Sequence, residues 1–224
     1  GSGYMLAESF QHRIVPVYPA LTALKCKGSS FKAWAGVRTE GEISLFTDGK
    51  FCKSERGELQ LTEYGISGIP VFQLSTYAVR AVREGHKAEL HINFMPELSE
   101  EELKKLLYAR KKACPYKKEK ELLVGLFPEK LIKILISQKQ LVSAIREFPL
   151  EVQDGMSFSQ AQVCSGGVDT SQVNSQTMES KLCRGLYFAG ELLDIDGTCG
   201  GYNLQWAWSS GAVAGKNAAK EEKN

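Results

Sequence analysis

The most informative stretch of this sequence is residues 185–215, which read GLYFAGELLDIDGTCGGYNLQWAWSSGAVAG. The apolar run at 186–189 predicts a short strand, and small residues at helical spacing predict a helix from about Tyr202 to Ala219. Acidic turn residues and a glycine pair lie between them. The stretch therefore predicts a strand, a loop and a helix, which is the local order of an α/β ligand site.

Two features of this stretch suit a ligand. Glu191 follows the predicted strand, at the sheet edge where open α/β sheets collect their ligands, and its carboxylate can accept hydrogen bonds from ribose or ribityl hydroxyls. Gly200 and Gly201 lack side chains at the start of the helix, so a ligand can approach its unpaired N–H groups and its positive end. A glycine-capped helix packed on a strand, without any ligand, is the alternative that these residues leave open.

The same stretch resembles the C-terminal FAD signature of a family of bacterial flavoproteins that includes aminoacetone-oxidase-like and bile-acid-reductase-like enzymes. The resemblance is dense over 161–215, which begins AQVCSGGVD. It also covers 1–21 and the motifs GELQLT and GISG within 57–68, and it is weak over 84–150. It implies an FAD-dependent oxidoreductase whose N-terminal half carries the nucleotide-binding Rossmann unit.

The resemblance also implies roles for individual residues. Gly190 and Glu191 are expected to line the ribityl and pyrophosphate side of FAD. The residues expected against the isoalloxazine ring are Gly200, Gly201, Tyr202, Asn203 and Leu204. The positive end of the helix would then stabilise the negative charge that hydride uptake leaves on the pyrimidine edge of the ring. Catalytic residues stay unassigned, because the candidate proton donors qualify by residue type only.

The expected fold is α/β (α+β) with an inserted domain. Short β-like runs over 22–95 predict a small antiparallel or mixed sheet, and leucine-rich helical patterns over 96–150 predict a helical cluster packed on it. Composition shifts and the resemblance together give three parts: the exit from the FAD-binding domain at 1–21, an inserted substrate-side domain at 22–153, and the C-terminal segment of a Rossmann-like FAD-binding domain at 154–224.

Apolar spacing and turn signals predict the individual elements. Strands are expected at 21–26, 31–37, 43–46, 58–62, 88–94 and 161–164. Helices are expected at 71–84, 100–112, 119–126, 128–137 and 139–148.

Charge and hydropathy argue against several function classes. The 28 basic and 26 acidic residues leave a formal charge of +2, so no broad field for nucleic acid or an anionic membrane is expected. The basic run at 111–120 is interpreted as a solvated helix end, with a phosphate-binding patch as the alternative. Since no signal segment and no run of about 18 apolar residues occurs, a cytoplasmic protein without membrane partners is expected.

Cysteine and histidine spacing gives no metal signature. The six cysteines form no C-x-x-C pair and the three histidines no H-E-x-x-H motif, so reduced thiols and no metal site are expected. The G-x-G-x-x-G fingerprint is also absent. We therefore expect the chain to be a fragment without its N-terminal half. FAD binding is expected of the intact protein and stays open for this chain alone.

Two functions follow from the sequence as hypotheses. The first is the C-terminal part of an FAD-dependent oxidoreductase, with hydride transfer through the flavin, a small-molecule substrate of unknown identity, and NAD(P)H as a candidate electron donor. The second is an isolated inserted domain that acts as a non-catalytic binding module. Bound yellow flavin that a reductant bleaches would separate the two.

Overall fold

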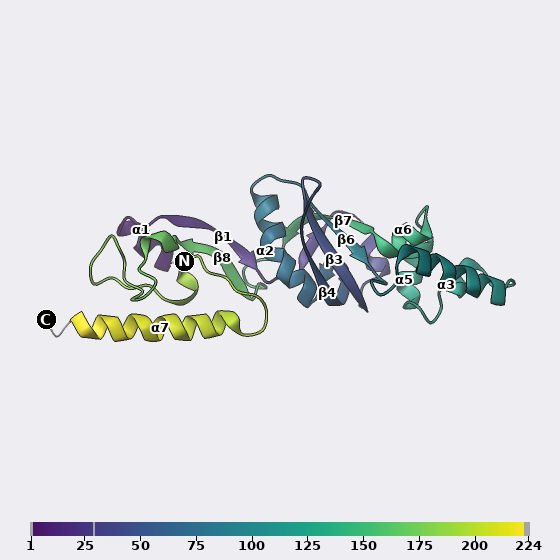
Figure 1. Ribbon diagram of the computed structural model, residues 1–224. Helices are drawn as coiled ribbons and strands as arrows, with labels where there is room; N and C mark the ends of the chain where they lie inside the picture. The colour runs from purple at the N-terminus through teal and green to yellow at the C-terminus, as the bar shows by residue number, and fades with distance from the viewer. Residues whose placement is uncertain (1, 29, 222–224) are drawn as a thin grey trace. The chain divides into compact units, whose positions relative to one another are not determined.

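The computed structural model describes residues 2–28 and 30–221 of this mixed α/β chain. The chain divides into two compact units. We call Thr22–Met156 the barrel unit, and Gly1–Leu21 with Ser157–Asn224 the terminal unit (Figure 1). That residues 22–153 fold independently as an inserted domain stays a prediction.

The barrel unit is built on antiparallel strands that close in the order β2-β5-β4-β3-β6-β7. Alternate residues along these strands, such as Ile43, Leu45 and Leu90, are fully buried, as the two-residue period of a strand requires. The bounds of the strands are Leu24–Cys26 (β2), Val37–Thr47 (β3), Lys50–Thr62 (β4), Gly65–Ser67 (β5), Ala88–Asn93 (β6) and Phe148–Gly155 (β7). The sheet expected over 22–95 is antiparallel, and β7, which pairs with both β6 and β2, closes it into a barrel.

Two local predictions in this unit are wrong. The strand expected at 31–37 is replaced by a 3₁₀-helix, η1 (Ser30–Ala33), which precedes β3. Phe31 and Trp34 are three residues apart, so a helical turn brings them to the same side, where their rings stack with centroids 5.5 Å apart. The helix expected to reach residue 148 ends at Arg146, and the strand β7 begins two residues later.

Helices pack against the strands of the barrel. Helix α2 (Ile69–Arg83) contacts β3, β4 and β7 (Figure 1). A cluster of short helices packs on the barrel through contacts of α6 with β6 and β7. Leu103, Leu131 and Ile145 are fully buried within this cluster. The bounds of its helices are Glu100–Ala113 (α3), Glu119–Leu122 (α4), Glu129–Ile136 (α5) and Leu141–Arg146 (α6).

The terminal unit joins segments from both ends of the chain. Strand β1 pairs antiparallel with β8, and the apolar core beside them includes Val168, Phe188 and Ala214. The elements of this unit are α1 (Ser2–Ser9), β1 (Ile14–Ala20), β8 (Val163–Val168), η2 (Thr170–Gln172), η3 (Gly190–Leu192) and α7 (Tyr202–Glu221). Among the described helices, none combines the length and the apolar character needed to cross a membrane.

The strand expected at 186–189 does not form a ladder within the described residues. The segment joins Glu179 through an isolated bridge at Tyr187, and the Phe188 N–H donates to the carbonyl of Met178 at 2.9 Å. Phe188 is buried and its apolar neighbours are partly buried against other parts of the terminal unit rather than within a sheet. Glu191 therefore follows an extended core segment and not the end of a sheet strand.

Candidate functional site

Most of the residues predicted to contact a cofactor gather around one cavity of the terminal unit. The cavity has a volume of about 340 Å³, within the range of roughly 300–1,000 Å³ that is usual for ligand pockets. Its lining residues are Leu21, Gln162, Val163, Glu191, Thr198, Cys199, Gly200, Gly201, Asn203, Leu204 and Ala207. Two predicted residues do not line it: Gly190 is buried beside Glu191, and Tyr202 is exposed.

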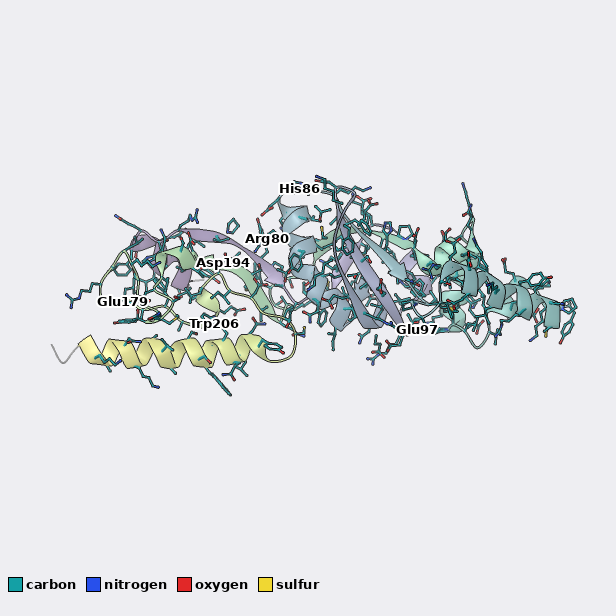
Figure 2. The ribbon with its side chains drawn as sticks, in the orientation of Figure 1. Arg80, His86, Glu97, Glu179, Asp194 and Trp206 are labelled. Atoms are coloured by element: carbon teal, nitrogen blue, oxygen red, sulfur yellow. The ribbon has the colours of Figure 1, made fainter. Side chains whose placement is uncertain are left out.

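Helix α7 holds the segment that carries Glu191. The N–H of Gly190 donates to the Ser210 hydroxyl at 2.9 Å, and the Trp206 indole N–H donates to the Gly190 carbonyl at 3.1 Å. Figure 2 shows Trp206 on the side of α7 that faces the rest of the terminal unit. Gly190 has a φ of 66°, and the Ala207 side chain would lie 3.5 Å from a Cβ placed there. The backbone of Gly190 thus fixes the neighbouring Glu191, which lines the cavity, against α7.

The Glu191 carboxylate is partly used within the protein. Its Oε1 accepts a hydrogen bond from the backbone N–H of Cys164 at 2.6 Å, which ties η3 to β8. The close approach of η3 to β8 also requires a glycine at 167, because a Cβ there would lie 2.6 Å from the carbonyl oxygen of Leu192. The second carboxylate oxygen can accept further hydrogen bonds, since an ionised carboxylate has about four acceptor sites.

The glycine pair forms the entry into α7. Gly200 and Gly201 have φ values of 119° and 91°, which residues other than glycine rarely adopt. The side chain of Asn203 closes the preceding loop: it accepts from the Gly197 N–H at 2.7 Å and donates to the Gly197 carbonyl at 2.9 Å. First-turn N–H groups of a helix have no intrahelical acceptor, so a ligand in the cavity meets donors and the positive end of the helix.

The thiols near the cavity are kept in their neutral form. Burial raises the pKa of Cys164, and the nearby Glu191 charge raises it further. Burial likewise raises the pKa of Cys199, which lines the cavity. Burial, followed by the charges of Cys164 and Glu191, raises the pKa of Tyr4. Because the thiolate is the nucleophilic form, these cysteines are poor nucleophiles at neutral pH.

Several lining residues were not predicted from the sequence. Gln162 and Val163 lie in the stretch 161–169, which carried the resemblance but no assigned role. Thr198 and Cys199 directly precede the glycine pair, and that proximity is a signal that could have found them. Among the described residues, no group of three or more His, Cys, Asp or Glu side chains is placed to hold a metal ion.

Comparisons with known proteins cover nearly the whole chain. Residues 1–217 match a family model described as the HI0933-like protein Rossmann domain. The chain is 40% identical over 237 aligned positions to the 3-dehydro-bile acid delta(4,6)-reductase of Clostridium scindens, covering 98% of this chain and 58% of that protein. It is also similar to the ribosomal RNA dihydrouridine synthases of Haemophilus influenzae (32% identity, 93% of this chain, 53% of that protein) and Escherichia coli (31%, 93% and 54%). The chain therefore spans a little more than half of the length of these relatives.

Proposed function

Because this chain belongs to the HI0933-like Rossmann-domain family, we propose that it contributes one wall of the flavin site of an FAD-dependent oxidoreductase. The observation that carries the proposal is the convergence of Glu191, the Gly200–Gly201 pair and the first turn of α7 on one cavity. The family match supports a dinucleotide cofactor, and the resemblance in residues 161–215 supports FAD in particular.

The residues around the cavity fit the parts of FAD chemically. Leu21, Val163 and Leu204 offer apolar surface to a flat aromatic ring. The first turn of α7 offers N–H donors and a positive end, which suit a ring edge that carries carbonyl oxygens. Glu191 offers an acceptor for hydroxyl groups. When bound, FAD would supply the acceptance and donation of a hydride, chemistry that no side chain provides.

Each residue of the chain has a distinct part in this proposal. Glu191 accepts from a hydroxyl of the cofactor with one oxygen while the Cys164 N–H holds the other. The glycine pair lets the cofactor approach the backbone, and Asn203 keeps the loop before the helix in place. Tyr202 and Leu204, which are 64% and 57% exposed, offer apolar surface beside the glycine pair. Gly190 acts through its backbone, since its N–H and carbonyl are both bonded to α7.

The names of the relatives suggest a substrate group. A delta(4,6)-reductase and a dihydrouridine synthase are both named for saturating a carbon–carbon double bond. A hydride adds readily only to an electron-poor carbon, so we propose that the complete protein reduces a double bond conjugated with a carbonyl. The hydride would go to the carbon far from the carbonyl and a proton to the near one, with NAD(P)H as the reductant. A small-molecule substrate stays a prediction, and the relatives give no support to the expected absence of a nucleic-acid partner, because two of them are named for ribosomal RNA.

The test is made on the complete gene product that carries this chain. Gly201→Val should lower bound flavin while the protein stays folded, because valine adds bulk and disfavours the positive φ at the helix entry. Gly85→Val is a matched control, since Gly85 has a φ of 90° and, like Gly201, open space where a Cβ would lie. Flavin absorbance and its bleaching by NADPH or NADH are the readouts.

The control decides how the result is read. Loss of flavin in Gly201→Val alone supports the proposed wall. Parent-level flavin in both variants, or equal loss in both, would show that the glycine pair is not at the cofactor. A gene product that never holds flavin would favour the binding-module hypothesis for the barrel unit.

A further inference from the structure

The barrel unit carries a concentrated positive charge at one end of its helical cluster. Residues 110–118, which we call the basic tip, end α3 and form the turn into α4. They read RKKACPYKK, with five basic residues and no acidic one. Figure 1 shows the last turn of α3 extending away from the barrel strands. The net charge of +2 for the whole chain does not reveal this local excess.

Two of the five basic residues hold the tip together. The Arg110 guanidinium donates to the carbonyls of Leu122 at 2.7 Å and Val124 at 2.8 Å, which fixes α3 against α4. The Lys111 ammonium donates to the carbonyls of Pro115 and Lys117 and closes the turn. These hydrogen bonds therefore fix the backbone conformation of the basic tip.

The other three basic residues of the tip are available to a partner. Lys112, Lys117 and Lys118 form no ion pair with any residue that the structure describes, whereas Lys104 and Lys120 nearby pair with Glu100 and Glu129. Lys112 and Lys118 are exposed, and Lys117 is half-buried. Like charges on one short segment repel one another, and a bound anion would relieve that repulsion.

Exposed aromatic rings lie among these lysines. Tyr108 is 70% exposed and Tyr116 is 80% exposed. Lys105, Tyr108 and Lys112 have the i, i+3, i+7 spacing that places side chains on one face of a helix, and all three are exposed. The surface thus alternates cations with flat rings.

A solvated helix end explains only part of this pattern. The helix dipole favours basic residues in the last turn of α3, but Lys117 and Lys118 lie beyond that helix. It does not account for the exposed rings. A membrane surface is a poor match, because Ala113, Cys114 and Pro115 between the charges give no apolar face to insert. Single-stranded nucleic acid matches both features, since lysines follow its phosphates and aromatic rings stack on its bases.

We propose that the basic tip, together with Lys105 and Tyr108, binds single-stranded nucleic acid. Lys112, Lys117 and Lys118 contact phosphates, and Tyr108 and Tyr116 stack on unpaired bases. The surface lies in the barrel unit and uses none of the residues of the cavity in the terminal unit, so binding does not require the flavin. Nucleic-acid binding by the basic tip is therefore independent of the proposed oxidoreductase function.

The first test measures binding of the full chain to a short labelled oligouridylate and to its DNA counterpart by fluorescence anisotropy over a salt series. With three phosphate contacts, the slope of log affinity against log salt should be about −2 or steeper, at roughly −0.7 per contact for single strands. The triple variant Lys112→Glu, Lys117→Glu, Lys118→Glu should bind at least about tenfold more weakly with a shallower slope. Comparing the RNA with the DNA shows which strand the surface prefers.

A matched variant controls for total charge. Lys32→Glu, Lys50→Glu, Lys139→Glu changes the net charge equally at three exposed lysines elsewhere in the barrel unit and should bind almost as the parent does. Circular dichroism checks that both triple variants are folded. Equal weakening in the two triple variants would overturn the proposal, because the attraction would then be a property of overall charge.

A second pair of variants tests stacking. Tyr108→Ala, Tyr116→Ala should weaken oligouridylate binding about tenfold or more, since one stacked base is worth about 1–3 kcal/mol. The same variant should bind heparin, which has charge but no bases, as the parent does. Parent-level oligonucleotide binding by the tyrosine variant would overturn the proposal. So would binding to phosphatidylserine vesicles with no binding to either oligonucleotide.

Discussion

Replacing Glu191 should weaken both the terminal unit and its cofactor site, because one carboxylate serves both. Its Oε1 accepts the Cys164 N–H at 2.6 Å. A hydrogen bond to a charged acceptor contributes about 1.5–3 kcal/mol, and exposure of Glu191 favours the lower end of that range. Glu191→Ala should therefore lower the free energy of unfolding by about 1.5 kcal/mol. Glu191→Gln keeps a neutral acceptor for Cys164 and should cost about 1 kcal/mol or less.

The second carboxylate oxygen sets the effect on cofactor affinity. If it accepts from an FAD hydroxyl, its loss in Glu191→Ala should weaken FAD binding about ten- to a hundredfold, and Glu191→Gln should weaken it less. The assays are urea unfolding, FAD titration into the deflavinated gene product, and the rate of flavin reduction at saturating FAD. Weakened binding with a nearly normal reduction rate is expected. Unchanged affinity with reduction abolished in Glu191→Gln would refute this reasoning and make the carboxylate a proton-transferring group.

Three further predictions address the fold and the thiols. Gly167→Ala should destabilise the terminal unit more than Glu191→Ala does, since a Cβ at 167 meets the Leu192 carbonyl at 2.6 Å; equal unfolding midpoints for parent and Gly167→Ala would contradict this. Burial raises the pKa of the Cys26 thiol to about 12. The thiol of the unfolded chain ionises at about pH 8.5, so the free energy of unfolding should fall as the pH rises from there to about 12. The contribution of Cys26 to this fall should be absent in Cys26→Ala. In the folded chain, the exposed Cys52 should react with a thiol reagent well before Cys26 does. Limited chymotrypsin digestion should cut first beside Phe158, which is 55% exposed in the segment between β7 and β8, and a first cut within 31–92 would count against an independently folded barrel unit.

Local sequence signals predicted the helices well. A helix was expected from residue 100, and the structure contains a full capping box at the start of α3, with the Ser99 N–H donating to the Glu102 carboxylate at 2.8 Å. Small residues at helical spacing predicted α7. These signals work because the interactions that stabilise a helix end or a helix face lie within a few residues of one another.

Strand pairing was harder to predict, because it depends on partners far along the chain. The alternation of Phe148, Leu150 and Val152 marks β7, but a helix was expected up to residue 148 and no strand after it before residue 161. In the structure Pro149 lies within β7 and pairs in register with His91. Closure of the barrel follows from the pairing of β7 with β6 and β2, so the closed form of the expected sheet could not be predicted without β7.

The candidate site was predicted in part. The glycine pair and Glu191 were predicted from the sequence, and the structure places them at one cavity, while their contact with FAD stays a prediction. The hydrogen bond between Glu191 and the Cys164 N–H could not be predicted, because it joins residues 27 positions apart through backbone atoms that carry no residue-specific signal. Asn203 was predicted as a cofactor contact, and in the structure its side chain bonds to Gly197.

Hydrogen exchange with and without FAD tests the central proposal most directly, because it reports on the cavity without depending on activity. In the deflavinated complete gene product, added FAD should slow amide exchange at 198–204, where the loop and the first turn of α7 line the cavity. Exchange in the basic tip at 110–118 should not change. Slowed exchange confined to 198–204 and the neighbouring Glu191 segment is the predicted result. Unchanged exchange at 198–204 under conditions where FAD is bound would contradict the proposal that this chain forms a wall of the flavin site.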